Sequence, residues 1–454
     1  MNNYLRGGVQ AGWATLFSFG VAGVPLLAQA SNLPTAVGDS FKINSPTDFA
    51  DPNNSPDVAR SASGGFVVAW AGTESADTNY SIYVRRFSKG GAALGSEFIA
   101  NAAPSTATMT ISKPKVAIAD DGGFVVVWQD ENRDPSNGNT SIVYKGRLFA
   151  ANGTPRMNEF CLDPVCTSED DSGIDGKTVA MDAAGNFVVS WIDFGTTSTD
   201  ASIKARRFSS DGSALDAAPM TVASGFHLGN LGSTLPRGLT STRNRKSGDF
   251  VIAWQKIHGY SVLLLLAGTN ETIEAQRYSA AGKVVGRPLL VNSCSSLYSY
   301  SIIAGCTMST ANLPQLTMTG DDAGNLIFAW TQTGKQDGSK LYARRFTSAG
   351  RAAGAKFSVA SLGRLGGTLS TAQDDAGDFV TAWDDASVVL GQSVSASDSV
   401  LASNLQISPA DKTTLGGAVA ADSDGNLTAV WVEYTATGEN SATGTVVGQL
   451  YKFP

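Results

Sequence analysis

Histidine, cysteine and charged residues are all scarce in this chain of 454 residues. It contains two histidines and four cysteines, and only 16% of its residues are Asp, Glu, Lys or Arg. The net charge of -7 and the isoelectric point near 5.0 argue against nucleic acid as a partner, because its binding depends on clustered Lys and Arg. The sequence has no G-x-S-x-G, H-E-x-x-H or phosphate-binding loop, which excludes the hydrolase, metalloprotease and nucleotide-binding proteins that carry these motifs.

The one long apolar run lies at the N-terminus. Arg6 is the only charged residue among the first 38, Val9 to Leu27 is mostly apolar, and Ala28-Gln29-Ala30 offers the small residues that signal peptidase requires. We expect residues 1–30 to be a signal peptide cleaved before Ser31, and the protein to be exported, either secreted or periplasmic. The alternative is a retained anchor, which the glycines and the proline within the run disfavour. No later segment is apolar enough to span a membrane.

The four cysteines fall into two local pairs, Cys161 with Cys166 and Cys294 with Cys306. An even number of cysteines in an exported chain favours disulfides. Three pairings are open, and we favour the two local ones because each pair lies within one predicted loop. Zinc is the alternative, but neither spacing matches the short C-x2-C knuckle of zinc sites.

Tryptophan reveals an internal repeat. Apart from Trp13 in the N-terminal run, each tryptophan follows a glycine by six residues, within the pattern G-[GND]-[FL]-x-x-x-W. The seven matches, numbered here as the first to seventh repeats, end at Trp70, Trp128, Trp191, Trp254, Trp330, Trp383 and Trp431. They are spaced by about 60 residues, a length that suits a four-stranded blade of a β-propeller. We expect these tryptophans to be structural.

Each repeat can be divided into four strands. In the second repeat, Pro114–Ile118 forms a first strand, a turn with Gly122 follows, and Phe124–Trp128 forms a second. Glycine tolerates the positive φ that tight hairpins require, and the nearly continuous apolar run is typical of a strand buried on both faces. With 49 glycines, the sequence predicts an all-β, seven-bladed propeller of four-stranded blades over residues 31–454. Residues 37–44 resemble a fourth strand and are expected to complete the seventh blade and close the ring.

The third strand carries a second repeated position. It is always Arg or Gln, at Arg85, Arg147, Arg206, Gln276, Arg344, Gln392 and Gln449. A ring of guanidinium groups for an anionic ligand is one interpretation. The favoured interpretation is structural, with each planar head bonded to backbone between blades or stacked on an aromatic ring. Gln offers a planar donor as Arg does but carries no charge, so the exchange between them favours this interpretation.

The repeat resembles that of secreted bacterial propeller proteins with the pattern D-x-x-G-x-F-V-V-x-W followed by A-R-R-F, a type also found in large exported, calcium-associated exoproteins. The resemblance covers about residues 37–454 and implies fold and export, without a catalytic set. The repeat departs from the Gly-His and Trp-Asp pairs of WD40 blades. It also departs from the sialidase box S-x-D-x-G-x-x-W, because its glycine lies six residues before the tryptophan instead of three.

Candidate ligand-binding residues follow the tryptophans, where the variable loops of a propeller begin. The second residue after each tryptophan is Gly72, Asp130, Asp193, Lys256, Gln332, Asp385 or Glu433, and Glu131 and Asp384 lie beside them. Around one mouth, such carboxylates can bind a cation, with calcium as the candidate, or hydrogen-bond a sugar. The alternative is that they solvate strand ends or cap turns. The Asp422–Asn426 segment resembles the start of a calcium loop, but the strand pattern that follows favours a plain hairpin turn.

The fourth repeat has two further features. His227 and His258, the only histidines, fall in predicted loops around it, where a metal-binding or acid–base role competes with an incidental one. The apolar segment Val262–Leu266 either packs as part of a strand or forms an exposed partner site. We favour packing, and we include His258 among the candidate ligand-binding residues.

Three functions remain open. The leading hypothesis is an exported, monomeric binding or scaffold module that holds a glycan or a protein at its variable loops, without nucleic acid or a membrane as a partner. The second is a hydrolase or lyase of extracellular polysaccharide that uses Asp130, Asp193 and Asp385 as acid and base. The third is a structural envelope or matrix component.

Overall fold

The computed structural model describes residues 34–45, 48–50, 55–74, 79–106, 109–136, 140–164, 166, 169–170, 176–194, 200–227, 233–262, 266–299, 302–310, 313–314, 316–334, 338–363, 367–400, 404–438 and 441–453. Throughout these residues the chain forms strands and turns and no helix, so none of them belongs to a helix able to cross a membrane. The predicted signal peptide, residues 1–30, lies outside them. Residues Asn32–Pro454 form one compact unit.

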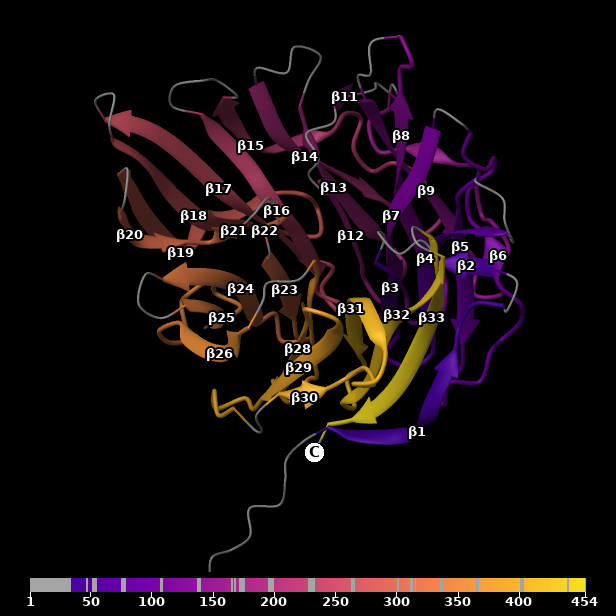
Figure 1. Cartoon of the computed structure of the whole chain (residues 1–454). Coiled ribbons are helices and arrows are strands. Elements are labelled where there is room, and N and C mark those ends of the chain that lie inside the picture. The colour runs from indigo at the N-terminus through magenta and orange to yellow at the C-terminus, as the bar shows by residue number, and fades with distance from the viewer. Residues whose placement is uncertain are drawn as a thin grey trace, which may run out of the picture. The chain divides into compact units, whose positions relative to one another are not determined.

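The first and seventh repeats share a nine-stranded sheet (Figure 1). Its strands, in hydrogen-bonded order, are β31 (Thr413–Ala421), β32 (Asn426–Gly438), β33 (Ser441–Lys452), β2 (Asp48–Ala50), β4 (Phe66–Glu74), β5 (Ser81–Phe87) and β6 (Phe98–Ile99), with β1 (Thr35–Lys42) on β33 and β3 (Asp57–Arg60) on β4. The N-terminal strand β1 therefore pairs with the last strand of the chain.

The second, third and sixth repeats form separate sheets. The second consists of β10 (Phe160–Cys161), β9 (Thr140–Phe149), β8 (Phe124–Arg133) and β7 (Met109–Ile118), with β11 (Glu169–Asp170) on β9. The third consists of β12 (Lys177–Met181), β13 (Phe187–Asp193), β14 (Asp200–Phe208) and β15 (Met220–His227). The sixth consists of β27 (Leu369–Gln373), β28 (Phe379–Asp385), β29 (Val388–Val394) and β30 (Leu405–Gln406).

The fourth and fifth repeats share a second nine-stranded sheet. Its order is β16 (Thr234–Arg243), β17 (Phe250–Val262), β18 (Leu266–Tyr278), β19 (Val284–Ser299), β20 (Ile302–Thr307), β24 (Leu326–Gly334), β25 (Gly338–Phe346) and β26 (Phe357–Leu362), with β23 (Leu316–Gly320) on β24. A two-stranded ribbon, β21 (Ser309–Thr310) with β22 (Leu313–Pro314), lies beside it.

The protein is thus an all-β propeller, but the prediction of seven four-stranded blades is wrong. The described strands form five large sheets, two of them nine-stranded. The reason is that two strands outside the repeat pattern bridge neighbouring repeats: β2 pairs with both β33 and β4, and β20 pairs with both β19 and β24. For the same reason β1 joins a nine-stranded sheet and does not complete a four-stranded seventh blade.

The first strand of each repeat packs beside that of the next, around a closed cycle. The cycle runs β3, β7, β12, β16, β23, β27, β31 and back to β3. The buried apolar residues lie between successive repeats, so that Trp128 packs with Val67 and Val84 of the first repeat. All seven repeat tryptophans are at most 3% exposed. Because each sheet has two apolar faces, both must be covered by neighbours.

At the repeated third-strand position, Arg147, Arg344 and Gln449 bond to backbone oxygens, and the two arginines also lie over aromatic rings. These are the contacts that a structural role predicts. Arg147 donates to the backbone oxygen of Ala100 in the preceding repeat at 3.1 Å and lies over the Phe149 ring. Arg344 does the same with Val291, at 2.8 Å. Gln449 donates to the backbone oxygen of Gly38 at 3.0 Å. These planar heads tie adjacent strands and repeats together.

The Asp422–Asn426 segment is a hairpin turn. The backbone N–H of Gly425 donates to the Asp422 carbonyl at 3.1 Å, and Gly425 adopts a φ of +76°. Oδ1 of Asp422 accepts from the backbone and side chain of Asn426. Its Oδ2 accepts from Nε of Arg60 in the first repeat at 3.1 Å, and both side chains are almost fully buried. The carboxylate is therefore engaged in holding the seventh repeat to the first.

We predict that Arg60→Met lowers the free energy of unfolding by about 3–5 kcal/mol, because it leaves the Asp422 carboxylate buried without its cation. The apolar side chain should fit, since Met181 occupies the same register position in the third repeat. Chemical denaturation measures the effect. The double variant Arg60→Met/Asp422→Asn should recover part of the loss, and a single variant within about 1 kcal/mol of wild type would contradict the prediction.

Candidate functional site

Three strands of the fourth repeat extend well beyond its tryptophan. β17 and β18 span 13 residues each and β19 spans 16, whereas β13 and β14 of the third repeat span 7 and 9. β17 and β18 stay paired without a register shift from Phe250 opposite Tyr278 to Val262 opposite Leu266. We call the paired part beyond Trp254 the fourth-repeat extension (Figure 1).

The two faces of this extension follow from the strand period of two. Phe250, Ile252 and Trp254 pack into the core shared with the third repeat, so Lys256, His258 and Tyr260 continue on that face. Val251 and Ala253 pack into the core shared with the fifth repeat, so Gln255 and Ile257 continue on the other. Each face is therefore part of the core up to Trp254, and beyond Trp254 the two faces carry different side chains.

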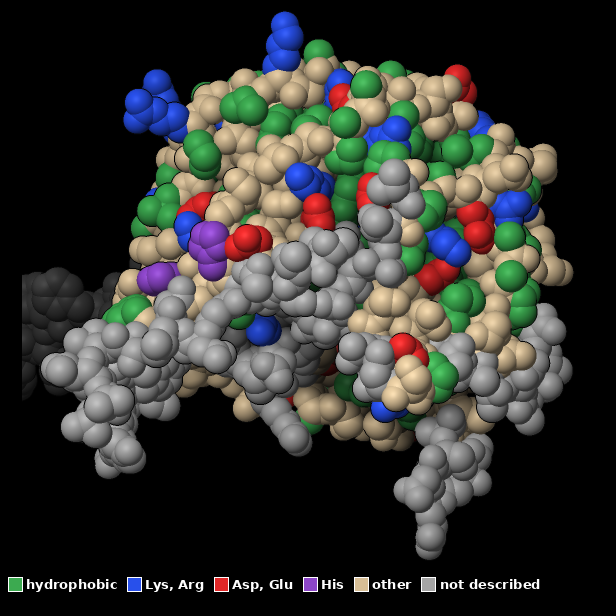
Figure 2. Space-filling view, turned by 90° about the horizontal axis from the view of Figure 1, so that it is seen from above, with side chains coloured by type: hydrophobic (Ala, Val, Ile, Leu, Met, Phe, Trp, Pro, Cys, Tyr) green, Lys and Arg blue, Asp and Glu red, His purple; other side chains and the backbone are tan. Residues whose placement is uncertain are grey.

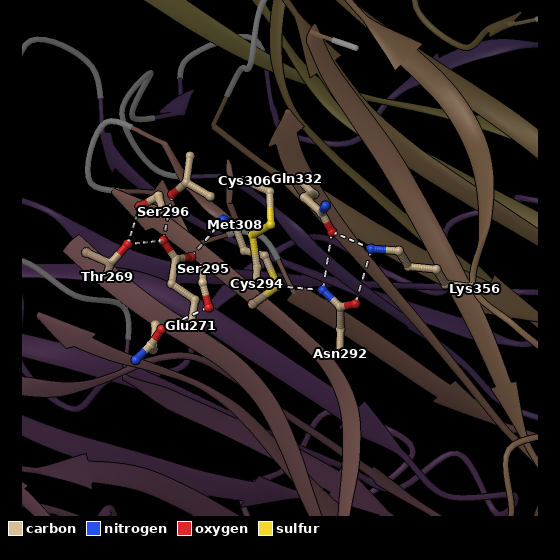
Figure 3. Close-up of a disulfide and its surroundings, with 12 residues drawn as sticks. Thr269, Glu271, Asn292, Cys294, Ser295, Ser296, Cys306, Met308, Gln332 and Lys356 are labelled. Carbon is tan, nitrogen blue, oxygen red and sulfur yellow. Dashed lines mark hydrogen bonds between the residues drawn. A yellow bond between two sulfur atoms is a disulfide. The ribbon is translucent and has the colours of Figure 1, made fainter. Parts of the chain in front are cut away.

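On the fifth-repeat side, Glu271 is a fully buried carboxylate that holds the sheet together. It accepts hydrogen bonds from Gln255 Nε2 at 3.0 Å, from the Met308 backbone N–H at 2.7 Å and from Thr307 Oγ1 at 2.6 Å. It lies opposite Cys294 across β18 and β19, beside the Cys294–Cys306 disulfide (Figure 3). With its oxygens satisfied in this way, Glu271 is structural.

Gln332, one of the predicted ligand-binding residues, belongs to a polar cluster on the same side (Figure 3). Its Oε1 accepts from Lys356 Nζ at 2.8 Å and from Asn292 Nδ2 at 3.2 Å. Lys356 also donates to Asn292 Oδ1 at 3.2 Å and lies over the Tyr342 ring, 4.7 Å from its centre. Burial, together with the nearby Arg344 charge, lowers the pKa of Lys356. The amide oxygen of Gln332 thus compensates a half-buried ammonium group.

On the third-repeat side, four polar residues form a row across four strands. Thr234, His258, Asn270 and Ser295 stand directly opposite one another in sequence on β16, β17, β18 and β19, so their side chains point to the same face. Thr234 Oγ1 and His258 Nδ1 are 2.9 Å apart, and Ser295 Oγ donates to Asn270 Oδ1 at 2.8 Å. We call these four residues the polar row.

An aromatic ring lies beside the polar row. Tyr260 is two residues beyond His258 on β17, and the two rings are nearly parallel with centres 6.4 Å apart. Tyr260 covers Gly268, its partner on β18, where an added Cβ would lie 2.5 Å from the ring. Asn270 and Ser295 are exposed, and His258 and Tyr260 are partly exposed. The arrangement offers a ring, a hydroxyl, an amide and an imidazole to one ligand.

Two of the predicted carboxylates contact their own tryptophans. Asp130 accepts from Trp128 Nε1 at 2.9 Å and pairs with Lys145 at 2.5 Å, and Glu433 accepts from Trp431 Nε1 at 3.4 Å. Residues two apart on a strand point to the same face, so a carboxylate in this position reaches the indole N–H. Their role as ligand-binding residues stays a prediction.

The remaining candidate carboxylates lie at strand ends or in the interior of the protein. Asp193 and Asp385 are half-buried at the ends of β13 and β28. Asp384 is 2% exposed and accepts from Thr368 Oγ1 at 2.8 Å and from the Gly416 and Gly417 backbone N–H groups at 3.2 and 3.1 Å. Burial raises the pKa of Asp384 despite these bonds.

The two histidines both appear, in purple, on the face shown in Figure 2. His227 is exposed and its Nδ1 contacts the Asp200 carboxylate, and His258 belongs to the polar row. Within the described residues no three His, Cys, Asp or Glu side chains are grouped so as to hold a metal ion. The centre of the apolar segment Val262–Leu266, residues 263–265, lies outside the described part.

The sequence interpretation missed Thr234, Tyr260, Asn270 and Ser295. Their juxtaposition depends on the register of four strands, and loops of variable length set that register. A weaker signal was present, since the alternation of β17 continues past Trp254 as Lys256, His258 and Tyr260. An extended strand with one polar face was therefore predictable, but its partners were not.

The two predicted local disulfides are confirmed: Cys161 is bonded to Cys166 and Cys294 to Cys306. The second bond joins β19 to β20 and so closes the hairpin that connects the fourth and fifth repeats. The first joins Cys161, the last residue of the outer strand β10 of the second repeat, to Cys166. Both are compatible with an exported protein.

No known family model and no curated protein matches this chain. Among solved structures, a protein of unknown function from Dyadobacter fermentans is similar over 93% of this chain and 99% of its own, with 9% identity and a TM-score of 0.48. An α-L-arabinofuranosidase of Fusarium graminearum in complex with arabinobiose covers 77% of this chain and 95% of its own, with 10% identity and a TM-score of 0.45. A Hadza microbial sialidase covers 91% and 68%, with 11% identity and a TM-score of 0.41. At these values the likenesses assign neither a family nor an activity.

We predict a pH-dependent stability contribution from Asp384. Because its folded pKa is raised, the folded state holds the proton more tightly than the unfolded state, and the stability gained by protonation is lost as the pH rises through the folded pKa. The difference in free energy of unfolding between wild type and Asp384→Asn should therefore fall as the pH rises above the ordinary pKa of an aspartate, about 4. Urea denaturation at each pH gives this difference. Two curves that run parallel with pH would contradict it.

Proposed function

We propose that this protein is an exported, non-catalytic binding module that holds a glycan along the polar row. The observation that carries the proposal is the alignment of Thr234, His258, Asn270 and Ser295 across four paired strands, next to the Tyr260 ring. Paired strands lie about 4.8 Å apart, so His258, Asn270 and Ser295 present polar groups at regular intervals. Thr234 is buried and contacts the His258 ring. A chain of sugar rings offers hydroxyls at a comparable repeat.

The chemistry of the row suits a neutral, hydroxyl-rich ligand. A hydroxyl donates and accepts, an amide does both from two atoms, and a neutral imidazole donates from one nitrogen and accepts at the other. The four residues of the row carry no carboxylate or ammonium group, and the ammonium group of Lys256 lies two residues before His258 on the same face of β17. The Tyr260 ring adds an apolar face with a polar tip, as sugar-facing and interface tyrosines commonly do.

A binding role is favoured over hydrolysis because the row lacks the required acids. Glycoside hydrolysis of the usual kind needs two carboxyl groups on either side of the scissile bond. The candidates for that role, Asp130, Asp193 and Asp385, lie on strands of three other repeats. Asp130 is already bonded to Trp128 and Lys145. The row therefore supports recognition without supplying a general acid and a base.

The test is calorimetric titration of the mature protein with neutral hemicellulose, β-glucan and uronic-acid oligosaccharides. Asn270→Ala and Tyr260→Ala should each weaken the binding of a responding oligosaccharide by about 10-fold, since each removes one bond or ring contact of about 1.4 kcal/mol. Asn152→Ala, at an exposed hairpin turn, is the matched control and should bind like wild type.

Two outcomes would overturn the proposal. One is unchanged affinity in both row variants, which would place the ligand elsewhere. The other is release of reducing ends from the bound oligosaccharide, which would show a hydrolase. A panel without any response would also count against a glycan as the ligand.

A further inference from the structure

A hollow of about 300 Å³ lies between the fourth and fifth repeats, at the opposite end of β17 from the polar row. Its walls include Phe250, Tyr278, Gly320 and Leu326, with Lys246 and Arg277 among the polar residues around them. We call it the wedge pocket. It lies at the end where the tight hairpin turns of these repeats are found, so the polar row and the wedge pocket are separate sites.

The pocket exists because two residues of the fifth repeat are smaller than their counterparts. Gly320 stands opposite Leu326 at the end of the first strand. The residues in the same register position elsewhere are Arg60, Ile118, Met181, Arg243, Gln373 and Ala421. Leu326 itself replaces the phenylalanine found in five of the other repeats, and only Leu427 shares its identity. A side chain is thus missing from one inter-repeat interface.

The apolar part of the lining comes from Val251, Val285 and Leu326, and Val251 and Leu326 belong to the core shared by the fourth and fifth repeats. The stacked rings of Phe250 and Tyr278, with centres 4.9 Å apart, pack on the other face of the sheet, in the core shared with the third repeat. A flat apolar group in the pocket would take the place that Phe124 and Phe187 fill in neighbouring interfaces.

The polar lining contains one donor without a partner. Arg277 Nη1 donates to the Ser348 carbonyl at 2.7 Å, but its Nε is buried and makes no hydrogen bond. An unsatisfied buried donor costs free energy that a bound acceptor would restore. The other charges are largely engaged, since Lys246 pairs with Asp322 at 3.1 Å and Asp249 accepts from the Ala280 backbone. The lining therefore favours a neutral ligand with an acceptor.

We propose that the wedge pocket binds a small neutral molecule that combines one aromatic ring with a carbonyl or amide oxygen. The ring fills the volume that the other repeats give to a side chain, and the oxygen accepts from Arg277. The volume agrees with small-molecule sites, which begin at about 300 Å³. This site goes beyond the proposed glycan function and does not depend on it.

The probe is benzamide, titrated into the full mature protein and followed by ligand-observed NMR, with toluene as the probe that lacks the acceptor. Benzamide should bind with a Kd on the order of 1 mM, a value within the limits for a ligand of this size, and toluene more weakly. Gly320→Met, which introduces the side chain of the third repeat, should abolish benzamide binding. Gly354→Met is the matched control, because Gly354 has open space around it, and should leave binding unchanged.

The variant Leu326→Phe tests the same pocket independently of whether Gly320→Met folds. Leu326→Phe restores the residue of the other repeats and should reduce benzamide binding at least 10-fold while keeping the thermal unfolding midpoint near that of wild type. Arg277→Lys should weaken benzamide while leaving toluene unchanged. Equal benzamide binding in wild type, Gly320→Met and Leu326→Phe, or no binding to wild type at 10-fold above the expected Kd, would overturn the proposal and identify the hollow as a solvent-filled void.

Discussion

The structure depends on one constraint: each sheet has two apolar faces, and only a neighbouring repeat can cover them. The second strand of a repeat is apolar on both sides, so Val125 and Val127 pack toward the third repeat while Val126 and Trp128 pack toward the first. A linear row of such sheets would leave two apolar faces in water, and a closed cycle leaves none. The cycle of first strands from β3 to β31 and back to β3 satisfies this requirement.

Polar contacts then fix how one repeat sits on the next. Arg147 and Arg344 donate to backbone oxygens of the preceding repeat. The ion pairs Arg60–Asp422 and Arg243–Asp182 also join neighbouring repeats, and their side chains are almost fully buried. Because each repeat contacts only its neighbours, an irregularity at one interface stays local. Gly320 and Leu326 can therefore leave a hollow between the fourth and fifth repeats without disturbing the rest of the cycle.

The repeat pattern predicted the propeller fold, the strands that carry the tryptophans and the glycine turns, and the spacing of the cysteines predicted both disulfides. All of these depend on residues close together in the chain. The number of sheets was not predictable in this way. β2 and β20 carry no repeat signature, and they join neighbouring sheets through pairing that only the tertiary arrangement determines. The loop position predicted for Asp130 is also wrong: it lies within β8, and the period of the strand places it beside the Trp128 indole.

The candidate site follows from the same constraint as the core. The face of β17 that carries Phe250, Ile252 and Trp254 is buried against the third repeat, whose own strands end sooner. Beyond Trp254 that face carries Lys256, His258 and Tyr260, all of them partly exposed. Apolar side chains in this part of β17 would form an exposed hydrophobic patch. Polar side chains can face water while the strand keeps its backbone hydrogen bonds. The proposed binding surface therefore lies where one repeat is longer than its neighbour, and the core below holds that surface in register.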